Sequence, residues 1–114
     1  MTKALAIAAV IATVAAPAAA APARLGVTAT EFRFSLSRTT LRRGPVLVEL
    51  GNFGEDVHDL RLRRIGGSRT YGLPETKPGE RRELAVRLRP GRYRLWCSIT
   101  DHRARGMWAT FRVR

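Results

Sequence analysis

The sequence contains very little of the chemistry on which most enzymes depend. It has one cysteine and two histidines, so no disulfide can form within the chain. It has only 9 acidic residues against 21 Lys and Arg. It also lacks a Ser/His/Asp set, a paired-carboxylate signature and a phosphate-binding glycine loop. These absences argue against the common catalytic classes, and we expect a protein that is not an enzyme.

A long hydrophobic run is also absent. Residues 4–16 are apolar apart from Thr13, but they are too short and too rich in alanine to span a bilayer, which takes about 20 strongly apolar residues. With Lys3 before this run and a run of alanines after it, the pattern is typical of a secretory signal peptide. We predict a signal over residues 1–23, cut after Ala20 or Ala23, and one domain over residues 24–114. The alternative is an uncleaved anchor, and both place the protein in the periplasm, outside the cell or at a membrane surface.

Sustained helical periodicity is missing after the signal. Instead, short segments alternate apolar and polar residues with a period of two, which is typical of half-buried strands. Glycine and proline separate these segments, so we predict an all-β fold of about seven strands, an antiparallel sandwich or barrel. Residues 65–79 lack periodicity and are predicted to be a long connection with at most one short edge strand. The alternating segments are residues 32–36, 46–50, 60–63, 83–88, 93–97 and 111–113.

The charge is unbalanced, at a formal +12. A cationic surface favours acidic partner proteins, anionic lipid or cell-wall polymer, and speeds the encounter with them. Nucleic acid is not expected, because the sequence shows neither a recognition helix nor an aromatic platform.

Cys97 opens the most informative stretch of the chain. An exported protein seldom keeps a free thiol, so Cys97 is an intermolecular bridge, a buried bystander or a metal ligand. It begins the pattern Cys97-x4-His102-x4-Met107, which lies between two predicted strands. Such a short loop brings a thiolate, an imidazole and a thioether together, and these ligands suit copper. A second imidazole can come only from His58, because the chain has no other histidine.

These residues resemble the copper-binding segments of the cupredoxins, particularly the small secreted bacterial ones. The similarity rests on the Cys97-x4-His102-x4-Met107 loop and on Gly91-x-Tyr93 before it, with Asn52 and His58-Asp59-Leu60 as the upstream segment. It implies a Greek-key β-sandwich that holds one copper ion near one end and serves one-electron transfer or copper handling. The chain departs from the family at Thr100-Asp101, where Pro-Gly is frequent, and at Trp108-Ala109, where a glycine is usual.

Each predicted ligand has an expected role. His58 anchors the metal to the sheet, Cys97 supplies the thiolate, His102 is the more exposed ligand and the port for electrons, and Met107 is the weak axial ligand. Asp59 either ties the His58 segment to the Cys97 loop or is a solvated charge. Arg103 and Arg105, which flank His102, either steer an acidic partner or are simply solvated.

Three functional hypotheses remain open at this point. The leading one is an exported, monomeric, mononuclear copper protein that carries single electrons to and from an acidic redox partner. The second is copper storage or delivery to a copper donor or acceptor through the same ligands. The third is a metal-free binding module that works through its cationic surface.

Overall fold

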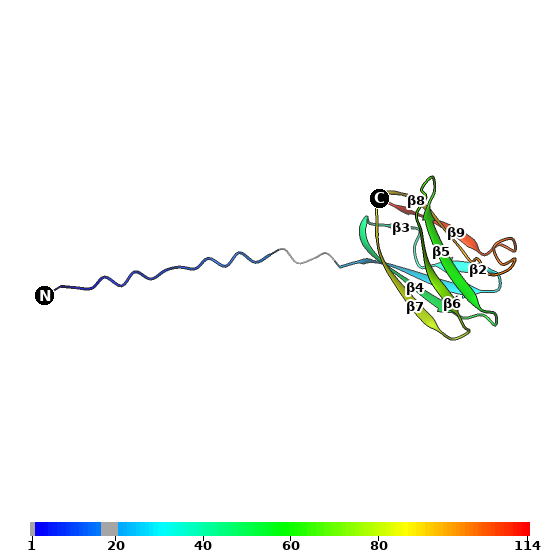
Figure 1. The fold of residues 1–114 in the computed structure, drawn as a ribbon, viewed down its shortest axis with the longest axis horizontal. Coiled ribbons are helices and arrows are strands. Elements are labelled where there is room, and N and C mark those ends of the chain that lie inside the picture. Colours follow the sequence, from blue (N-terminus) through cyan, green and yellow to red (C-terminus); the bar gives the residue numbers. More distant parts are fainter. Residues whose placement is uncertain (1, 17–20) are drawn as a thin grey trace.

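The computed structural model describes residues 2–16 and 21–114, and the sandwich occupies residues 23–113 (Figure 1). Residues 2–16 carry no regular secondary structure, and the described residues include no helix long and apolar enough to cross a membrane. The nine strands are β1 (Ala23–Thr30), β2 (Arg33–Leu36), β3 (Thr40–Leu41), β4 (Gly44–Asn52), β5 (His58–Arg64), β6 (Thr70–Thr76), β7 (Arg81–Leu88), β8 (Gly91–Trp96) and β9 (Trp108–Val113).

The strands form two sheets, which confirms the predicted all-β sandwich. One sheet has the order β2-β1-β4-β7 and the other has the order β3-β9-β8-β5-β6. Two pairings, β1 with β4 and β3 with β9, are parallel, whereas we had expected only antiparallel pairs. Parallel neighbours need a crossover connection, and residues 31–43 supply one between β1 and β4.

The core lies between the sheets and is built from the inward rows that the alternation predicts. Leu25, Val27 and Ala29 of β1 are buried, and so are their counterparts on β4, which lies beside it. From the facing sheet, Leu62 of β5 and Leu95 of β8 are paired in register and fully buried. Each buried leucine or valine stabilises the fold by roughly 1.5–3 kcal/mol relative to an exposed one.

The region predicted to be a long connection contains a full strand. Within residues 65–79, β6 pairs with β5 along the edge of the five-stranded sheet. Its burial pattern does not alternate along the strand. Pro74 lies inside this strand, as proline does on sheet edges. Periodicity therefore could not reveal β6.

The two ends of the sandwich are well separated. The nine residues of β4 span about 26 Å at the usual strand rise. His58 begins β5 at the end where Asn52 closes β4, and Ala23 enters β1 at the other end, opposite Val46. The predicted cut after Ala20 falls in residues 17–20, outside the described residues, and the signal peptide stays a prediction.

Candidate metal centre

Three of the predicted ligands meet at one end of the sandwich. His58 is the first residue of β5, Cys97 directly follows β8, and His102 lies in the loop that leads to β9. One ligand atom from each side chain lies within 4.8 Å of the other two, and all three residues are buried. The pairing of β5 with β8 thus brings together His58 and Cys97, which are 39 positions apart in sequence.

Met107 adjoins this cluster. Its side chain is fully buried, and its backbone N–H donates to the His102 carbonyl at 3.1 Å. Its own carbonyl accepts from the Cys97 N–H at 3.0 Å. The loop from Cys97 to Met107 is therefore closed on itself by backbone hydrogen bonds, as its short length predicts.

The loop makes its sharpest turn just before His102. The His102 N–H donates to the Ile99 carbonyl at 3.0 Å, and Thr100 between them has a φ of +43°. A left-handed conformation is unusual for a β-branched residue, whose Cβ crowds the backbone. Of the two residues that depart from the family here, Thr100 and not Asp101 adopts the left-handed conformation.

Asp59 joins the two segments that carry the ligands. Its carboxylate accepts from the Ser98 backbone N–H at 2.6 Å and from the Ser98 hydroxyl. Its own N–H points at Cys97 Sγ at 3.5 Å. The prediction that Asp59 ties the His58 segment to the Cys97 loop is confirmed, and the tie holds the sulfur at a fixed place.

Asn52 organises the turn that leads into His58. Its buried side-chain amide donates to the carbonyls of Asp56 and Thr76, both at 2.8 Å, and its Oδ1 accepts from the Gly54 N–H at 2.9 Å. One side chain thereby fixes residues 52–56 against β6. This contact gives a physical reason for an asparagine upstream of His58.

The His58 ring is oriented by a carboxylate that the sequence did not reveal. Its Nε2 lies 3.2 Å from Glu31 Oε1, which also accepts from the N–H groups of Glu55 and Asp56 at 2.7 Å. These hydrogen bonds, chiefly that from Asp56, lower the pKa of Glu31. Glu31 is 27 residues before His58, so no local spacing connects the two. Only the turn between β1 and β2 brings it to the site.

The other nitrogen of His58 has no hydrogen-bond partner among the described residues. This atom, Nδ1, is buried, and the side chain is 0% exposed. A buried polar atom without a partner costs roughly 1–3 kcal/mol, so its presence needs an explanation. With Glu31 on Nε2, Nδ1 is left with a lone pair available to a ligand.

His102 closes the site toward solvent. Its Nδ1 lies 3.6 Å from Cys97 Sγ, and its Nε2 lies 3.8 Å from an Asp56 carboxylate oxygen. Its ring packs at 5.0 Å, centroid to centroid, from both Phe32 and His58. His102 is 6% exposed and His58 is not exposed, so the predicted order of exposure is confirmed, although both are buried.

Solved structures share this architecture. No protein-family model matches the chain, and no curated protein matches it. Auracyanin A, described as a "blue" copper protein from Chloroflexus aurantiacus, superposes with a TM-score of 0.67 at 17% identity, over 82% of this chain and 100% of that one. Reduced auracyanin from Roseiflexus castenholzii gives 0.66 at 14%, over 83% and 99%. Copper-containing nitrite reductase from Thermus scotoductus gives 0.53 at 24%, over 89% of this chain and 25% of that one.

The fold is cupredoxin-like. At these identities the similarity establishes the arrangement of strands, and the chemistry of the site has to be argued from its own residues. The cupredoxin resemblance expected from the Cys97-x4-His102-x4-Met107 loop is thereby confirmed at the level of the fold.

The donor set of this cluster fits a single copper ion. Burial raises the pKa of the Cys97 thiol, so the metal-free protein holds a neutral sulfur there, and a bound cation would favour the thiolate. Two imidazoles and one thiolate form the trigonal donor set of a blue-copper centre, in which a methionine is the usual weak axial ligand. The unpartnered Nδ1 of His58 fits the same interpretation, because a neutral imidazole nitrogen is a metal ligand.

The charged residues around the His102 loop mostly have partners within the protein, either in an ion pair or over an aromatic ring. Arg105 pairs with Asp101 at 2.6 Å and lies over Phe32 at 4.9 Å, and the guanidinium lowers the pKa of Asp101. Arg103 lies 4.9 Å over Trp96. Trp108 faces outward and is 49% exposed, beside Arg94 at 5.4 Å. Trp108 therefore shapes the outer surface of the sheet rather than the inside of the cluster.

Proposed function

We propose that this chain binds one copper ion through His58, Cys97 and His102, with Met107 as the weak axial ligand, and carries single electrons. The observation that supports this most strongly is the buried, preformed cluster in which His58 Nδ1 has no other partner. A core histidine with a structural role would have both nitrogens satisfied or solvated.

The bound ion would supply the one-electron couple, and the protein would hold its ligands in place. Ser98 and Asp59 lock the Cys97 loop to β5, and Asn52 fixes the turn before His58. A site held from two separate segments resists rearrangement when the charge of the metal changes. Such rigidity suits electron transfer, since each transfer then requires little movement of the ligands.

His102 would serve as the port, because its ring is the ligand nearest to solvent. Phe32 and Arg105 border it, and Asp101 already partners Arg105. Arg103 is then the flanking cation left to steer an acidic redox partner toward the port. We further propose that the protein is a monomer that acts outside the cytoplasm and does not bind nucleic acid.

We propose a carrier and not an enzyme. The chain has two histidines, and both belong to the one cluster. A second copper centre of the kind used to reduce or oxidise substrates needs further histidines that this chain does not contain.

Copper titration tests the proposal. Adding Cu(II) to the purified protein is expected to produce an intense thiolate-to-copper absorption band that saturates at one equivalent. Cys97→Ser should abolish the band, and His58→Ala should weaken binding, whereas Ser98→Ala, which keeps all four ligands, should retain it. A colourless titration would contradict the proposal and favour the metal-free binding module.

Voltammetry then separates a carrier from a copper-delivery protein. A carrier is expected to cycle reversibly between Cu(II) and Cu(I) without losing metal. Rapid transfer of Cu(I) to a chelator of moderate affinity, with loss of the band on reoxidation, would instead indicate delivery.

A further inference from the structure

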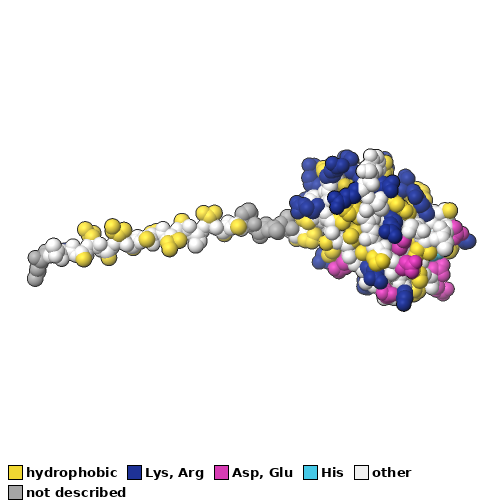
Figure 2. All heavy atoms as spheres, in the orientation of Figure 1, with side chains coloured by type: hydrophobic (Ala, Val, Ile, Leu, Met, Phe, Trp, Pro, Cys, Tyr) yellow, Lys and Arg dark blue, Asp and Glu magenta, His cyan; other side chains and the backbone are white. Residues whose placement is uncertain are grey.

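Positive charge gathers at the end of the sandwich opposite the cluster. Figure 2 shows Lys and Arg side chains crowded where the N-terminal segment joins the domain, and acidic side chains gathered toward the other side. Glu31, Asp56, Asp59 and Asp101 all contact the ligand segments. These carboxylates therefore lie at the end of the sandwich away from the concentration of arginine.

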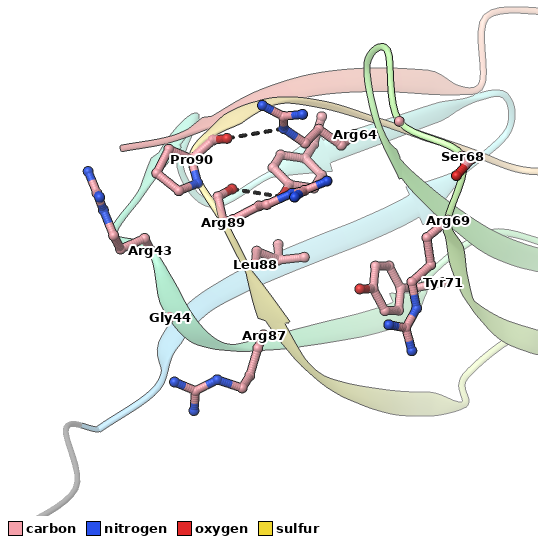
Figure 3. A pocket seen from close by; sticks show the side chains of 12 residues that line it. Arg43, Gly44, Arg64, Ser68, Arg69, Tyr71, Arg87, Leu88, Arg89 and Pro90 are labelled. Atoms are coloured by element: carbon pink, nitrogen blue, oxygen red, sulfur yellow. Dashed lines mark hydrogen bonds between the residues drawn. The ribbon is translucent and has the colours of Figure 1, made fainter.

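An open hollow of about 650 Å³ occupies the positive end (Figure 3). No acidic residue lines it. Tyr71 and Tyr93 form part of its wall, and Arg69 lies 5.1 Å over the Tyr71 ring. The arginines that line it are Arg43, Arg64, Arg69, Arg87 and Arg89.

A second hollow adjoins the first through Arg43 and Pro90 and adds three more arginines, Arg92, Arg112 and Arg114. We call these eight residues the arginine end. Within the described part of the chain, none of them forms an ion pair with a carboxylate. Two use a guanidinium N–H on a backbone carbonyl: Arg64 on Pro90 at 3.1 Å, and Arg43 on Arg114 at 3.3 Å. Arg69 lies over the Tyr71 ring, and the other five form neither an ion pair nor a side-chain hydrogen bond with the described residues.

Concentrating so many unpaired cations costs self-repulsion, which an external anion would relieve. Guanidinium groups bind phosphate oxygens in a bidentate manner, so a phosphate-bearing partner fits the hollow. The partner has to be broad, because the eight arginines extend over two adjoining hollows and more than one strand. These features together favour a surface of phosphates over a single small anion.

The route of the chain favours a lipid surface. Ala23 begins β1 opposite Val46, and Gly44 of the same β4 strand lines the hollow. The apolar residues 4–16 therefore lead into the sandwich at the arginine end. While that segment is held at a membrane, the arginine end of the domain would face the lipid headgroups.

We propose that the arginine end docks on an anionic phospholipid surface, with headgroup phosphates in the hollow lined by Arg87 and Arg89. The cluster of His58, Cys97 and His102 then lies about 26 Å away and points toward the aqueous side. Binding to lipid is independent of the metal, and only the significance of the orientation rests on the proposed copper function.

Vesicle binding by the full-length protein tests the docking. Partitioning is compared between vesicles of one part phosphatidylglycerol to three parts phosphatidylcholine and vesicles of phosphatidylcholine alone, at about 0.1 M salt. The apolar segment contributes to the partitioning into both vesicle types. The ratio of the two partition coefficients therefore reports the contribution of the lipid charge. Each surface arginine is expected to contribute about fivefold, so Arg87→Gln with Arg89→Gln should lower the ratio by roughly 25-fold.

The chain offers a matched control. Arg81 lies on β7 as Arg87 does, and both are exposed, but Arg81 pairs with Gly51 at the cluster end and Arg87 pairs with Pro45 at the arginine end. Arg81→Gln with Arg33→Gln makes the same change in net charge. Because these sites lie farther from the membrane than a Debye length of about 10 Å, the ratio should change by less than about twofold.

Fluorescence reports the orientation. The two tryptophans, Trp96 and Trp108, are cross-strand neighbours at the cluster end, and Trp108 is half-exposed. Lipids brominated in their chains are therefore expected to leave the emission of the bound protein nearly unquenched. Strong quenching would overturn the orientation.

Three further results would overturn the docking itself. The first is an equal affinity for both vesicle types, and the second is an equal loss in the arginine-end and control variants. The third is soluble polyphosphate binding as tightly as the vesicles at equal phosphate concentration, which would identify a soluble polyanion as the partner. Because the copper band is measured separately, a failure here leaves the proposed copper function standing.

Discussion

At the arginine end, glycines occupy the left-handed turn positions, and the buried Tyr93 hydroxyl has a hydrogen-bond partner. The Tyr93 hydroxyl donates to the Arg89 carbonyl at 2.7 Å, and the left-handed positions are occupied by Gly44 and Gly66. At the cluster end, Thr100 occupies a left-handed position and His58 Nδ1 has no partner. Two unfavourable local features, the Thr100 conformation and the unpartnered Nδ1, therefore lie at or beside the proposed ligands, and the rest of the fold supports them.

The same comparison holds for charge. The cluster end holds carboxylates that accept hydrogen bonds from the ligand segments, whereas the arginine end holds cations without acidic partners. A carboxylate near a metal that alternates between two charges favours the more positive state. A cation at the far end is too distant to act on the metal and is free to serve another contact.

Replacing Glu31 should give the largest effect on the cluster end. Glu31→Gln keeps an oxygen for the His58 Nε2–H but removes the negative charge, so Cu(II) should lose more affinity than Cu(I). We expect the ratio of the Cu(II) affinity to the Cu(I) affinity to fall about tenfold, which corresponds to a rise of about 59 mV in the reduction potential. Protein-film voltammetry measures it.

Glu55→Gln is the matched control for this variant. Glu55 is exposed, and its backbone N–H donates to Glu31, but its side chain forms no hydrogen bond among the described residues. A rise in potential as large as that of Glu31→Gln would mean that general charge, and not the bond to His58, sets the potential. An unchanged potential in both variants would show that Glu31 only positions the ring.

The sequence predicted the cluster better than its surroundings, for physical reasons. Cys97, His102 and Met107 lie within one loop, and His58 follows by elimination, so rare residue types revealed the site. Glu31 was not predicted, because its contact with His58 joins distant turns. The strand β6 was expected only as a short edge strand, because it lies on a sheet edge and its residues do not alternate. The sequence also did not predict that arginines concentrate at one end of the sandwich, since net charge carries no information about which end of a strand an arginine occupies.

Removing the Tyr93 hydroxyl, which lies at the arginine end, should lower the stability of the fold. Tyr93→Phe leaves the Arg89 carbonyl without its donor, and we expect a loss of about 1 kcal/mol in the free energy of unfolding at pH 7. Burial raises the pKa of Tyr93, so the stability that it contributes is complete below its unfolded pKa of about 10 and falls as the pH rises beyond that. Urea unfolding at pH 7 and at about pH 10.5 measures both effects.

The other tyrosine provides the comparison. Tyr71 is half-buried and lies under Arg69, and its hydroxyl forms no hydrogen bond among the described residues. Tyr71→Phe should therefore change the free energy of unfolding by much less than Tyr93→Phe does. Equal losses in the two variants would mean that the hydroxyl bond at Arg89 does not anchor this end.

Removing the backbone strain at Thr100, in the turn before His102, should change the free energy of unfolding least. It should raise that free energy, whereas Tyr93→Phe lowers it. A Cβ in the left-handed region costs roughly 1–2 kcal/mol, and glycine gives back about 0.4–1 kcal/mol in the entropy of the unfolded chain. Thr100→Gly should therefore raise the free energy of unfolding by about 0.5 kcal/mol, whereas Gly44→Ala, at a φ of +104°, should lower it. Thr100→Ala controls for the hydroxyl, which donates to Asp101 at 3.2 Å, and should not stabilise the fold. A gain in Thr100→Gly with an unchanged potential would make the turn a tolerated irregularity, whereas a gain with a shifted potential would mean that the strained turn holds His102 where the metal needs it.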